Sequence, residues 1–401
     1  MRIAIVGCGF VADYYMSTFP NYPELEVVGV MDRDSQRASA FARFWKISRI
    51  YPSLDDLLSD PRVEIVLNFT NPSSHYTVSH AALTADKHVY SEKPLAMVFQ
   101  EAEALVDLAE SRGLSLSGAP CSLLGEAAQT IWKALRQGMA GKTRVAYAEL
   151  DEGMLHLMSF RNWTSPSGIP WPNVDEFEVG ATLEHAGYYV TWLAAFFGPA
   201  RSVTAYASCQ VPEKDSAVAP DRMSADFSVG VIEFVSGVVA RLTCSLVAAH
   251  DHTLRIFGDA GILSCKDSWM YDSPVYFERL NIPCKPGRRA VRIPPESKIL
   301  NGAWNYLAPR ILREPGPILI PPVREAKFQS YPPNTHHMDF ARGVAEQAEA
   351  LRESRPCRLS ARFLLHVNEI VLALQPPRGA NGTRKMTSTF EPIASMPWAE
   401  Q

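Results

Sequence analysis

Residues 1–120 alternate short runs of β-branched and aliphatic residues with longer amphipathic segments. Parallel strands that are buried on both faces and joined by crossover helices give this pattern. We expect strands at 2–6, 26–31, 65–68, 88–90 and 114–117, and a helix at 100–112. The sequence therefore predicts an N-terminal domain, residues 1–122, built as an α/β doubly wound parallel sheet.

From residue 143 onward, longer runs alternate apolar and polar positions, as in antiparallel strands. The runs 226–234 and 238–247 are joined by Ser236-Gly237, which suits a hairpin turn. Residues 274–333 are rich in proline and predict a long surface excursion, and Ser360 is a plausible cap for a helix at about 360–375. Residues 123–401 are therefore expected to form an α+β domain with an open, mostly antiparallel sheet.

Composition narrows the functional class. With 39 Lys and Arg against 43 Asp and Glu, the formal charge of −4 favours neither a nucleic-acid partner nor a membrane surface. The longest apolar run outside the N-terminus, 188–197, is about half of what a membrane-spanning helix needs. The seven cysteines are widely spaced, which fits neither a zinc knuckle nor a disulfide framework. We expect a cytoplasmic protein.

Residues 7–12 read Gly-Cys-Gly-Phe-Val-Ala and follow the first predicted strand directly. In this G-x-G-x-x-A spacing, Gly7 permits a tight turn, Gly9 lets backbone N–H groups approach a pyrophosphate, and Ala12 lets the helix pack closely on the strand. Asp32 ends the second predicted strand, where an acid can bind the adenosine ribose. The pattern predicts a dinucleotide site that also includes Phe10 and Val11.

The acid at position 32 favours NAD(H), because its carboxylate would repel a 2′-phosphate. Arg33 follows it directly, and its guanidinium could bind that phosphate and admit NADP(H). NAD is the expected cofactor, with NADP as the alternative.

Ser91-Glu92-Lys93-Pro94 follows the fourth predicted strand, and Thr70-Asn71-Pro72 with His75 follows the third. Together with the glycine turn, these residues resemble the Gfo/Idh/MocA oxidoreductases, the relatives of glucose-fructose oxidoreductase and inositol dehydrogenase. The resemblance implies a Rossmann domain, a second domain on an open antiparallel sheet, and hydride transfer on sugars, cyclitols or their derivatives. It also implies that Lys93 lies beside the nicotinamide, and it adds to the cofactor site Thr70, Asn71, Pro72, His75, Glu92 and Lys93.

Physical chemistry supports a role for Lys93. An ammonium that is partly desolvated beside an oxidised nicotinamide has its pKa lowered, so it can take or relay a proton at neutral pH. Its predicted place at the carboxyl end of a parallel strand is where open α/β sheets bind ligands. The alternative is a surface lysine at a strand end.

A second family signature, an Asp followed four residues later by a His, maps onto residues 180–189 with both residues replaced. Anchoring on Gly187 places His185 and Tyr189 at these positions, and Glu184 belongs to the alternative register. Residues i and i+4 share a helix face, so His185 and Tyr189 are candidate catalytic residues. The charge of Lys93 would favour the phenolate of Tyr189. The competing interpretation is that this aromatic helix is only core.

Other charged clusters carry weaker signals. His250 with His252, and His336-His337 with Asp339, each lack a convincing third ligand, so no metal is expected. The basic residues Arg288, Arg289 and Arg292 could bind the phosphates of a nucleotide-linked sugar, or they could be solvated loop charges.

The sequence thus predicts an NAD(P)-dependent oxidoreductase that moves a hydride between nicotinamide and a secondary alcohol or ketone of a sugar-like small molecule. Loss of the Asp/His pair favours ketone reduction. Two alternatives remain: a redox-neutral glycosidase or eliminase that uses NAD transiently, and a regulator that binds NAD and a sugar without chemistry. An open sheet with one apolar face needs cover, so a homodimer or homotetramer is expected.

Overall fold

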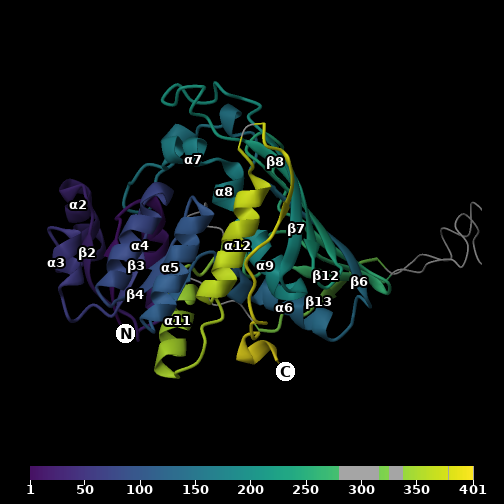
Figure 1. The fold of residues 1–401 in the computed structure, drawn as a ribbon, viewed down its shortest axis with the longest axis horizontal. Helices are drawn as coiled ribbons and strands as arrows, with labels where there is room; N and C mark the ends of the chain where they lie inside the picture. Colours follow the sequence, from purple (N-terminus) through teal and green to yellow (C-terminus); the bar gives the residue numbers. More distant parts are fainter. Residues whose placement is uncertain (280–315, 325–336, 378, 401) are drawn as a thin grey trace, which may run out of the picture.

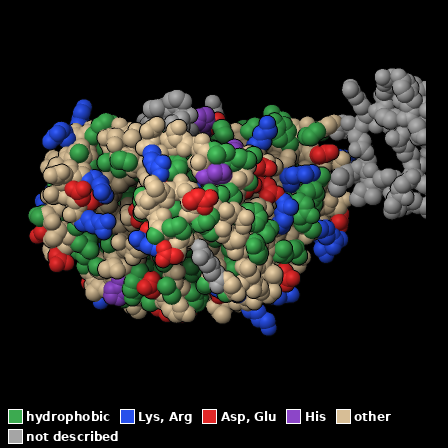
Figure 2. Space-filling model, turned by 90° about the horizontal axis from the view of Figure 1, so that it is seen from above, with side chains coloured by type: hydrophobic (Ala, Val, Ile, Leu, Met, Phe, Trp, Pro, Cys, Tyr) green, Lys and Arg blue, Asp and Glu red, His purple; other side chains and the backbone are tan. Residues whose placement is uncertain are grey.

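The structure is a computed structural model that describes residues 1–279, 316–324, 337–377 and 379–400. Two sheets organise the chain, one in its first third and one in the remainder, and they lie side by side (Figure 1). Over the described part of the face in Figure 2, acidic and basic side chains are interspersed. None of the helices in the described ranges is long and apolar enough to cross a membrane.

The first sheet has five parallel strands in the order β2-β1-β3-β4-β5. Their bounds are β1 Arg2–Val6, β2 Glu26–Met31, β3 Ile65–Asn68, β4 His88–Ser91 and β5 Leu116–Gly118. The crossover helices are α1 Phe10–Thr18, α2 Ser35–Trp45, α3 Leu54–Leu58, α4 His75–Thr84 and α5 Phe99–Ser111. The order reverses next to β1, so the turn after β1 lies at the switch point where such sheets bind ligands. The predicted doubly wound parallel sheet is confirmed.

Both faces of this sheet are covered. Ala4 and Val6 pack with α4 and α5, whereas Ile3 and Ile5 pack with α1 and α2. A helix from the far end of the chain, α11 Arg342–Arg352, joins the second of these cores through Val344 and its neighbours. A helix from the C-terminal part of the chain therefore completes the hydrophobic core on one face of the N-terminal sheet.

The second sheet has nine strands in the order β13-β12-β11-β10-β6-β9-β8-β7-β14. Only β6 and β9 pair in parallel among these neighbours of the described chain, so the sheet is mostly antiparallel, as predicted. The bounds are β6 Thr143–Asp151, β7 Ala200–Ser208, β8 Phe227–Phe234, β9 Val239–Ser245, β10 Leu254–Gly258, β11 Gly261–Cys265, β12 Val275–Arg279, β13 Ile318–Ile320 and β14 Gly382–Lys385. The expected excursion at 274–333 lies largely outside the described residues, which stop at 279 and resume for 316–324.

Helices cover one face of the second sheet. They are α6 Glu126–Arg136, α7 Asn173–Val179, α8 Ala181–His185, α9 Gly187–Phe197 and α12 Ala361–Leu374. α12 begins after Ser360, whose hydroxyl accepts a hydrogen bond from the Phe363 N–H, and it packs against α5 on one side and β7 on the other (Figure 1). The opposite face of the sheet carries exposed side chains such as Tyr147 and Tyr206.

Candidate active site

The turn after β1 has the geometry that a dinucleotide pyrophosphate requires. Gly7 has φ +96°, and a Cβ there would lie 2.6 Å from the backbone of Phe69 on the neighbouring strand. Gly9 caps α1 without any side-chain hydrogen bond, and a Cβ there would meet nothing within 4 Å. The first N–H groups of α1 thus face open space, which is the feature that binds phosphate at helix N-termini. Ala12 is fully buried on the other side of the helix.

Asp32 lies beside this turn. Its carboxylate accepts hydrogen bonds from the Cys8 N–H and the Asp34 N–H, both at 2.8 Å. A cavity of about 610 Å³ opens here and is lined by both glycines, Asp32, Arg33, Arg37 and Thr70, among others. Phe10 and Val11 form the first turn of α1 and are not among its lining residues. The cradle fits a dinucleotide, with an acid and two guanidinium groups where the adenosine ribose would lie.

The loop after β3 forms the opposite wall of the cavity. Thr70 and Asn71 line it, and the Asn71 amide donates to the carboxylate of Asp175 on α7 at 2.7 Å. Pro72 follows and opens a short 3₁₀ turn. His75 is buried rather than exposed to the cavity, because its two ring nitrogens lie 2.7 Å and 2.8 Å from the carbonyl oxygens of Pro94 and Thr70. His75 therefore ties this loop to the loop that carries Lys93.

Lys93 lies two residues after the end of β4. The neighbouring Glu92 is fixed by Tyr15 of α1, whose hydroxyl donates to it at 2.7 Å, and by the backbone N–H of Lys93 at 3.0 Å. The Lys93 ammonium donates to Glu184 of α8. This ion pair joins the carboxyl edge of the first sheet to the helices of the second, and both side chains are largely buried.

The ion pair changes the expected electrostatics of Lys93. Burial alone would lower the pKa of the amine, but the acidic side chains around it, of which Glu184 acts most strongly, together outweigh burial and hold that pKa above its ordinary value. Without a dinucleotide, Lys93 is therefore an ammonium that donates, and the lowered pKa expected beside an oxidised nicotinamide stays a prediction.

The tyrosine that interacts electrostatically with Lys93 is Tyr188. Burial raises the pKa of its phenol, and the positive charge of Lys93 acts in the opposite direction, so the two groups lie within electrostatic reach. Glu184 lies in α8 and Tyr188 in the first turn of α9, on either side of the turn at Ala186. Glu184, the residue of the alternative register, is the one that contacts Lys93.

The expected approach of Tyr189 to Lys93 is wrong. Tyr189 is fully buried, and its hydroxyl donates to the backbone carbonyl of His252. Burial raises the pKa of this phenol well above its ordinary value, so no phenolate is favoured. One residue along a helix rotates the side chain by about 100°, and this rotation points Tyr189 into the core.

His185 also does not converge with Tyr189. Its ring lies between two carboxylates, with Nδ1 3.0 Å from Glu152 and Nε2 2.6 Å from Glu176, and it stacks on Trp269 at 5.7 Å. Burial alone would lower the pKa of His185, but the two carboxylates raise it to about 10. His185 is therefore a buried cation behind Tyr188, whose ring lies 5.1 Å from the same indole.

Sequence reasoning missed a contact between the two sheets at α1. Asp13 is fully buried and accepts hydrogen bonds from the hydroxyls of Ser165 and Ser167, from the Ser167 N–H at 3.0 Å, and from the Trp45 indole at 2.6 Å. A segment of the second domain is thus fastened to the helix that begins at the glycine turn. The sequence signal for this contact was an acidic residue, Asp13, within an otherwise apolar part of the predicted helix.

His337 and Asp339, the described part of a second candidate cluster, contact different partners. His337 pairs with Asp272 at 3.4 Å, whereas Asp339 is buried and accepts from Tyr22 at 2.8 Å. His336 lies outside the described residues, as do Arg288, Arg289 and Arg292.

Comparison with known proteins decides the family. Residues 1–118 match the NAD-binding Rossmann fold of the GFO_IDH_MocA oxidoreductase family, and residues 128–264 match the GFO/IDH/MocA C-terminal domain. The chain belongs to the Gfo/Idh/MocA family. A curated relative is the mouse (Mus musculus) trans-1,2-dihydrobenzene-1,2-diol dehydrogenase, 29% identical over 67% of this chain and 75% of that protein.

Solved structures support the family fold. An oxidoreductase from Agrobacterium radiobacter in complex with NAD⁺, L-tartaric acid and magnesium has a TM-score of 0.73 at 16% identity, covering 96% of this chain and 98% of that one. A 3-ketoreductase from Actinomadura kijaniata in complex with TDP-benzene and NADP has a TM-score of 0.65 at 19% identity, covering 92% and 95%. This member of the Gfo/Idh/MocA family is an oxidoreductase with an NAD-binding Rossmann domain, as predicted.

Proposed function

We propose that this Gfo/Idh/MocA protein interconverts a secondary alcohol and a ketone on a hydroxylated ring, and that it works chiefly as a ketoreductase. The supporting observation is the arrangement of Lys93, Glu184 and Tyr188. The Lys93 ammonium and the Glu184 carboxylate that holds it lie at the carboxyl end of β4, two strands from β1, which precedes the dinucleotide turn. The neutral phenol of Tyr188 is within electrostatic reach of that ammonium.

Each of these three residues has a separate role in the proton transfer. Burial keeps the phenol of Tyr188 neutral, so it is the proton donor to a carbonyl oxygen. The phenolate that forms is stabilised by the adjacent Lys93 ammonium, which Glu184 keeps charged and in place. In the opposite direction the same phenolate accepts the proton of the alcohol. When bound, the nicotinamide supplies or accepts the hydride.

Residues of the cavity would hold the dinucleotide. Gly7 and Gly9 leave room for the pyrophosphate at the N-terminus of α1, and Asp32 faces the place of the adenosine ribose. Thr70 and Asn71 form the wall toward the nicotinamide half, and Glu92 supports the backbone of Lys93.

The relatives narrow the substrate class. The mouse relative is named for a cyclic trans-diol, and the ketoreductase from Actinomadura kijaniata was solved with a nucleotide-linked compound. A six-membered ring that carries neighbouring oxygens is common to cyclic diols, cyclitols and sugars. We therefore expect a sugar, nucleotide-sugar, cyclitol or related cyclic diol.

A substrate panel with absorbance detection of reduced nicotinamide tests this proposal. We expect turnover with at least one keto or hydroxy ring compound, and we expect Lys93→Met to lower kcat by about 10²- to 10⁴-fold while the dinucleotide Kd changes little. Lys87→Met is the matched control, since Lys87 binds backbone carbonyls at the other end of β4. A Lys93→Met enzyme with unchanged kcat would contradict the proposal, and product formation without a change in absorbance would favour the redox-neutral alternative.

We also propose that the open face of the second sheet forms a homodimer or homotetramer interface. Tyr147 and Tyr206 are 39% and 48% exposed on it, and the Arg241 guanidinium lies 4.6 Å over the Tyr147 ring. Exposed aromatic and arginine side chains are enriched at protein interfaces. Sedimentation velocity is expected to show an oligomer that Tyr147→Glu dissociates, and a monomeric wild type would refute this.

A further inference from the structure

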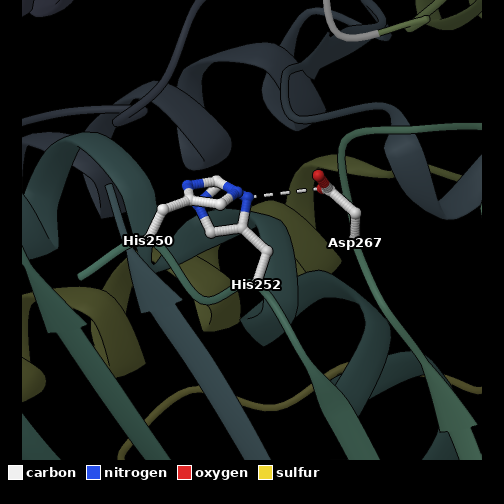
Figure 3. A group of neighbouring side chains, drawn as sticks. All are labelled: His250, His252 and Asp267. Atoms are coloured by element: carbon white, nitrogen blue, oxygen red, sulfur yellow. Dashed lines mark hydrogen bonds and ion pairs between the residues drawn. The ribbon is translucent and has the colours of Figure 1, made fainter. Parts of the chain in front are cut away.

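A second cluster of ionisable side chains lies on the sheet domain and shares the carboxylate of Glu152 with His185. His250 and His252 are two residues apart in the segment before β10, and their rings lie 4.2 Å apart. Asp267 follows β11, and its Oδ1 lies 3.3 Å from Nδ1 of His252. One ligand atom from each residue can be chosen so that all three lie within 4.8 Å of one another. Figure 3 shows the three side chains converging from two separate segments.

The backbone around this cluster is fixed. Asp251 and Asp151 exchange two backbone hydrogen bonds of 3.0 Å, which anchors the segment that carries both histidines. The Asp251 carboxylate also accepts the Thr253 N–H at 2.9 Å, so it is used locally. Asp267 is oriented because its Oδ1 accepts the Trp269 N–H at 2.7 Å. The three side chains therefore meet with their positions set by other contacts, as a binding site requires.

The far side of His252 has a second carboxylate. Nε2 of His252 lies 3.3 Å from Glu152, while Nδ1 faces Asp267. A ring nitrogen that donates to a carboxylate fixes the tautomer and makes the other nitrogen a better metal ligand. His252 is 2% exposed, whereas His250 is exposed to solvent, so the cluster combines a rigid inner ligand with an accessible outer one.

We propose that His250, His252 and Asp267 bind a divalent transition-metal cation of the Zn²⁺ type. Two imidazole nitrogens and one carboxylate oxygen are ligands that Zn²⁺ prefers, and the exposed side of the cluster leaves a further position for water or an oxygen ligand. The sequence alone offered the two histidines without a third ligand, and the fold supplies it from fifteen residues farther along the chain.

Charge at the cluster also favours a cation. The carboxylates of Asp267 and Glu152 face the two ring nitrogens of His252 at 3.3 Å each. A cation held by the cluster is therefore balanced by negative charge that the fold already places there.

Zn²⁺ titration of the chelator-treated full chain, followed by competition with a chromogenic chelator and by counting of bound metal, tests the site. We expect one Zn²⁺ at this site. His250→Ala, which changes an exposed side chain, is expected to weaken its binding by more than the roughly 100-fold that loss of a second-shell partner can cost. His80→Ala is the matched control, because His80 is exposed on α4 and is expected to leave Zn²⁺ binding unchanged. Equal binding by wild type and His250→Ala, or no binding by wild type at micromolar Zn²⁺, overturns the proposal.

Co²⁺ provides a second measurement that does not depend on one variant. Wild type with one Co²⁺ is expected to show visible ligand-field absorption, which His250→Ala and Asp267→Asn lose. Asp267→Asn keeps an oxygen that can accept the Trp269 N–H, so the fold around it is retained. Absorption that persists in both variants overturns the assignment. No dinucleotide or substrate is needed, so this result is independent of the proposed oxidoreductase substrate.

Discussion

Glu184 holds the ammonium of Lys93, and this contact joins the helix layer of the second sheet to the carboxyl edge of the first. An amine buried beside a carboxylate stays charged at neutral pH. In the mechanism that we propose, Lys93 is a fixed positive charge that stabilises negative charge on oxygen, and the proton that moves belongs to Tyr188.

Tyr188→Phe and Tyr189→Phe form a matched pair, since adjacent residues of one helix lose the same hydroxyl. We expect Tyr188→Phe to lower kcat by about 10²- to 10⁴-fold with little loss of stability. Tyr189→Phe is expected to keep kcat and to cost about 1 kcal/mol of unfolding free energy, because a buried hydrogen bond to the His252 carbonyl is lost. Steady-state kinetics measures kcat, and denaturant unfolding measures stability. If Tyr189→Phe lowered kcat and Tyr188→Phe did not, Tyr189 would be the proton donor.

Substitutions at Gly9 and Gly7 are expected to have different effects, the first on dinucleotide binding and the second on stability. Gly9 has an extended backbone and open space at its Cβ, so Gly9→Val is expected to fold normally and to weaken dinucleotide binding by at least about tenfold. Gly7→Ala is expected to destabilise the fold by more than about 1 kcal/mol, because φ is positive and Phe69 blocks the Cβ. Calorimetric titration and thermal unfolding distinguish the two, and a Gly9→Val protein with wild-type affinity would place the dinucleotide elsewhere.

Asp32 is expected to set the preference between the two dinucleotides. Asp32→Asn removes the charge that repels a 2′-phosphate, while Arg33 and Arg37 stay at the cavity. The ratio of the Kd values for NAD(H) and NADP(H) is therefore expected to shift toward NADP(H), and Arg37→Gln in the same background is expected to reverse part of that shift. A ratio that does not respond to either change would show that the adenosine end lies away from these side chains.

His185 predicts a pH dependence of stability. Its pKa in the folded chain is about 10, above the ordinary 6.5, so its contribution is fully present below about 6.5 and is lost as pH rises through 10. His185→Gln is expected to reduce the fall in unfolding free energy between these pH values, by up to about 1.4 kcal/mol per pH unit for one proton. Denaturant unfolding over pH 6.5–10 checks this, and parallel curves for both proteins would mean that the ring is neutral when folded.

Much of the first sheet could be predicted from the sequence, because a buried parallel strand is a continuous apolar run with sharp ends. The predicted strands at 2–6, 26–31 and 65–68 coincide with β1, β2 and β3. The glycine turn was equally clear, since the strand, the helix and Asp32 all agree with one geometry.

The site on the second domain was harder to predict. Anchoring the signature on Gly187 selected His185 and Tyr189, whereas in the structure Glu184 contacts Lys93 and Tyr188 interacts with it electrostatically. The spacing of residues in a sequence shows which of them share a helix face. It does not show which face contacts the other domain. Asp267 was missed for the same reason, since only strand pairing brings it to the histidines.

The placement of α11 has a consequence for how the chain can be divided. Val344, Ala345 and Ala348 fill the same buried core as Ile3 and Ile5, although more than 300 residues of sequence separate them. A fragment that ended after β5 would leave that apolar surface open to water and lose the hydrophobic free energy of its burial. The nucleotide-binding part of this chain is therefore continuous in space and discontinuous in sequence, because the helix that completes it follows strands β6 to β13 of the second sheet.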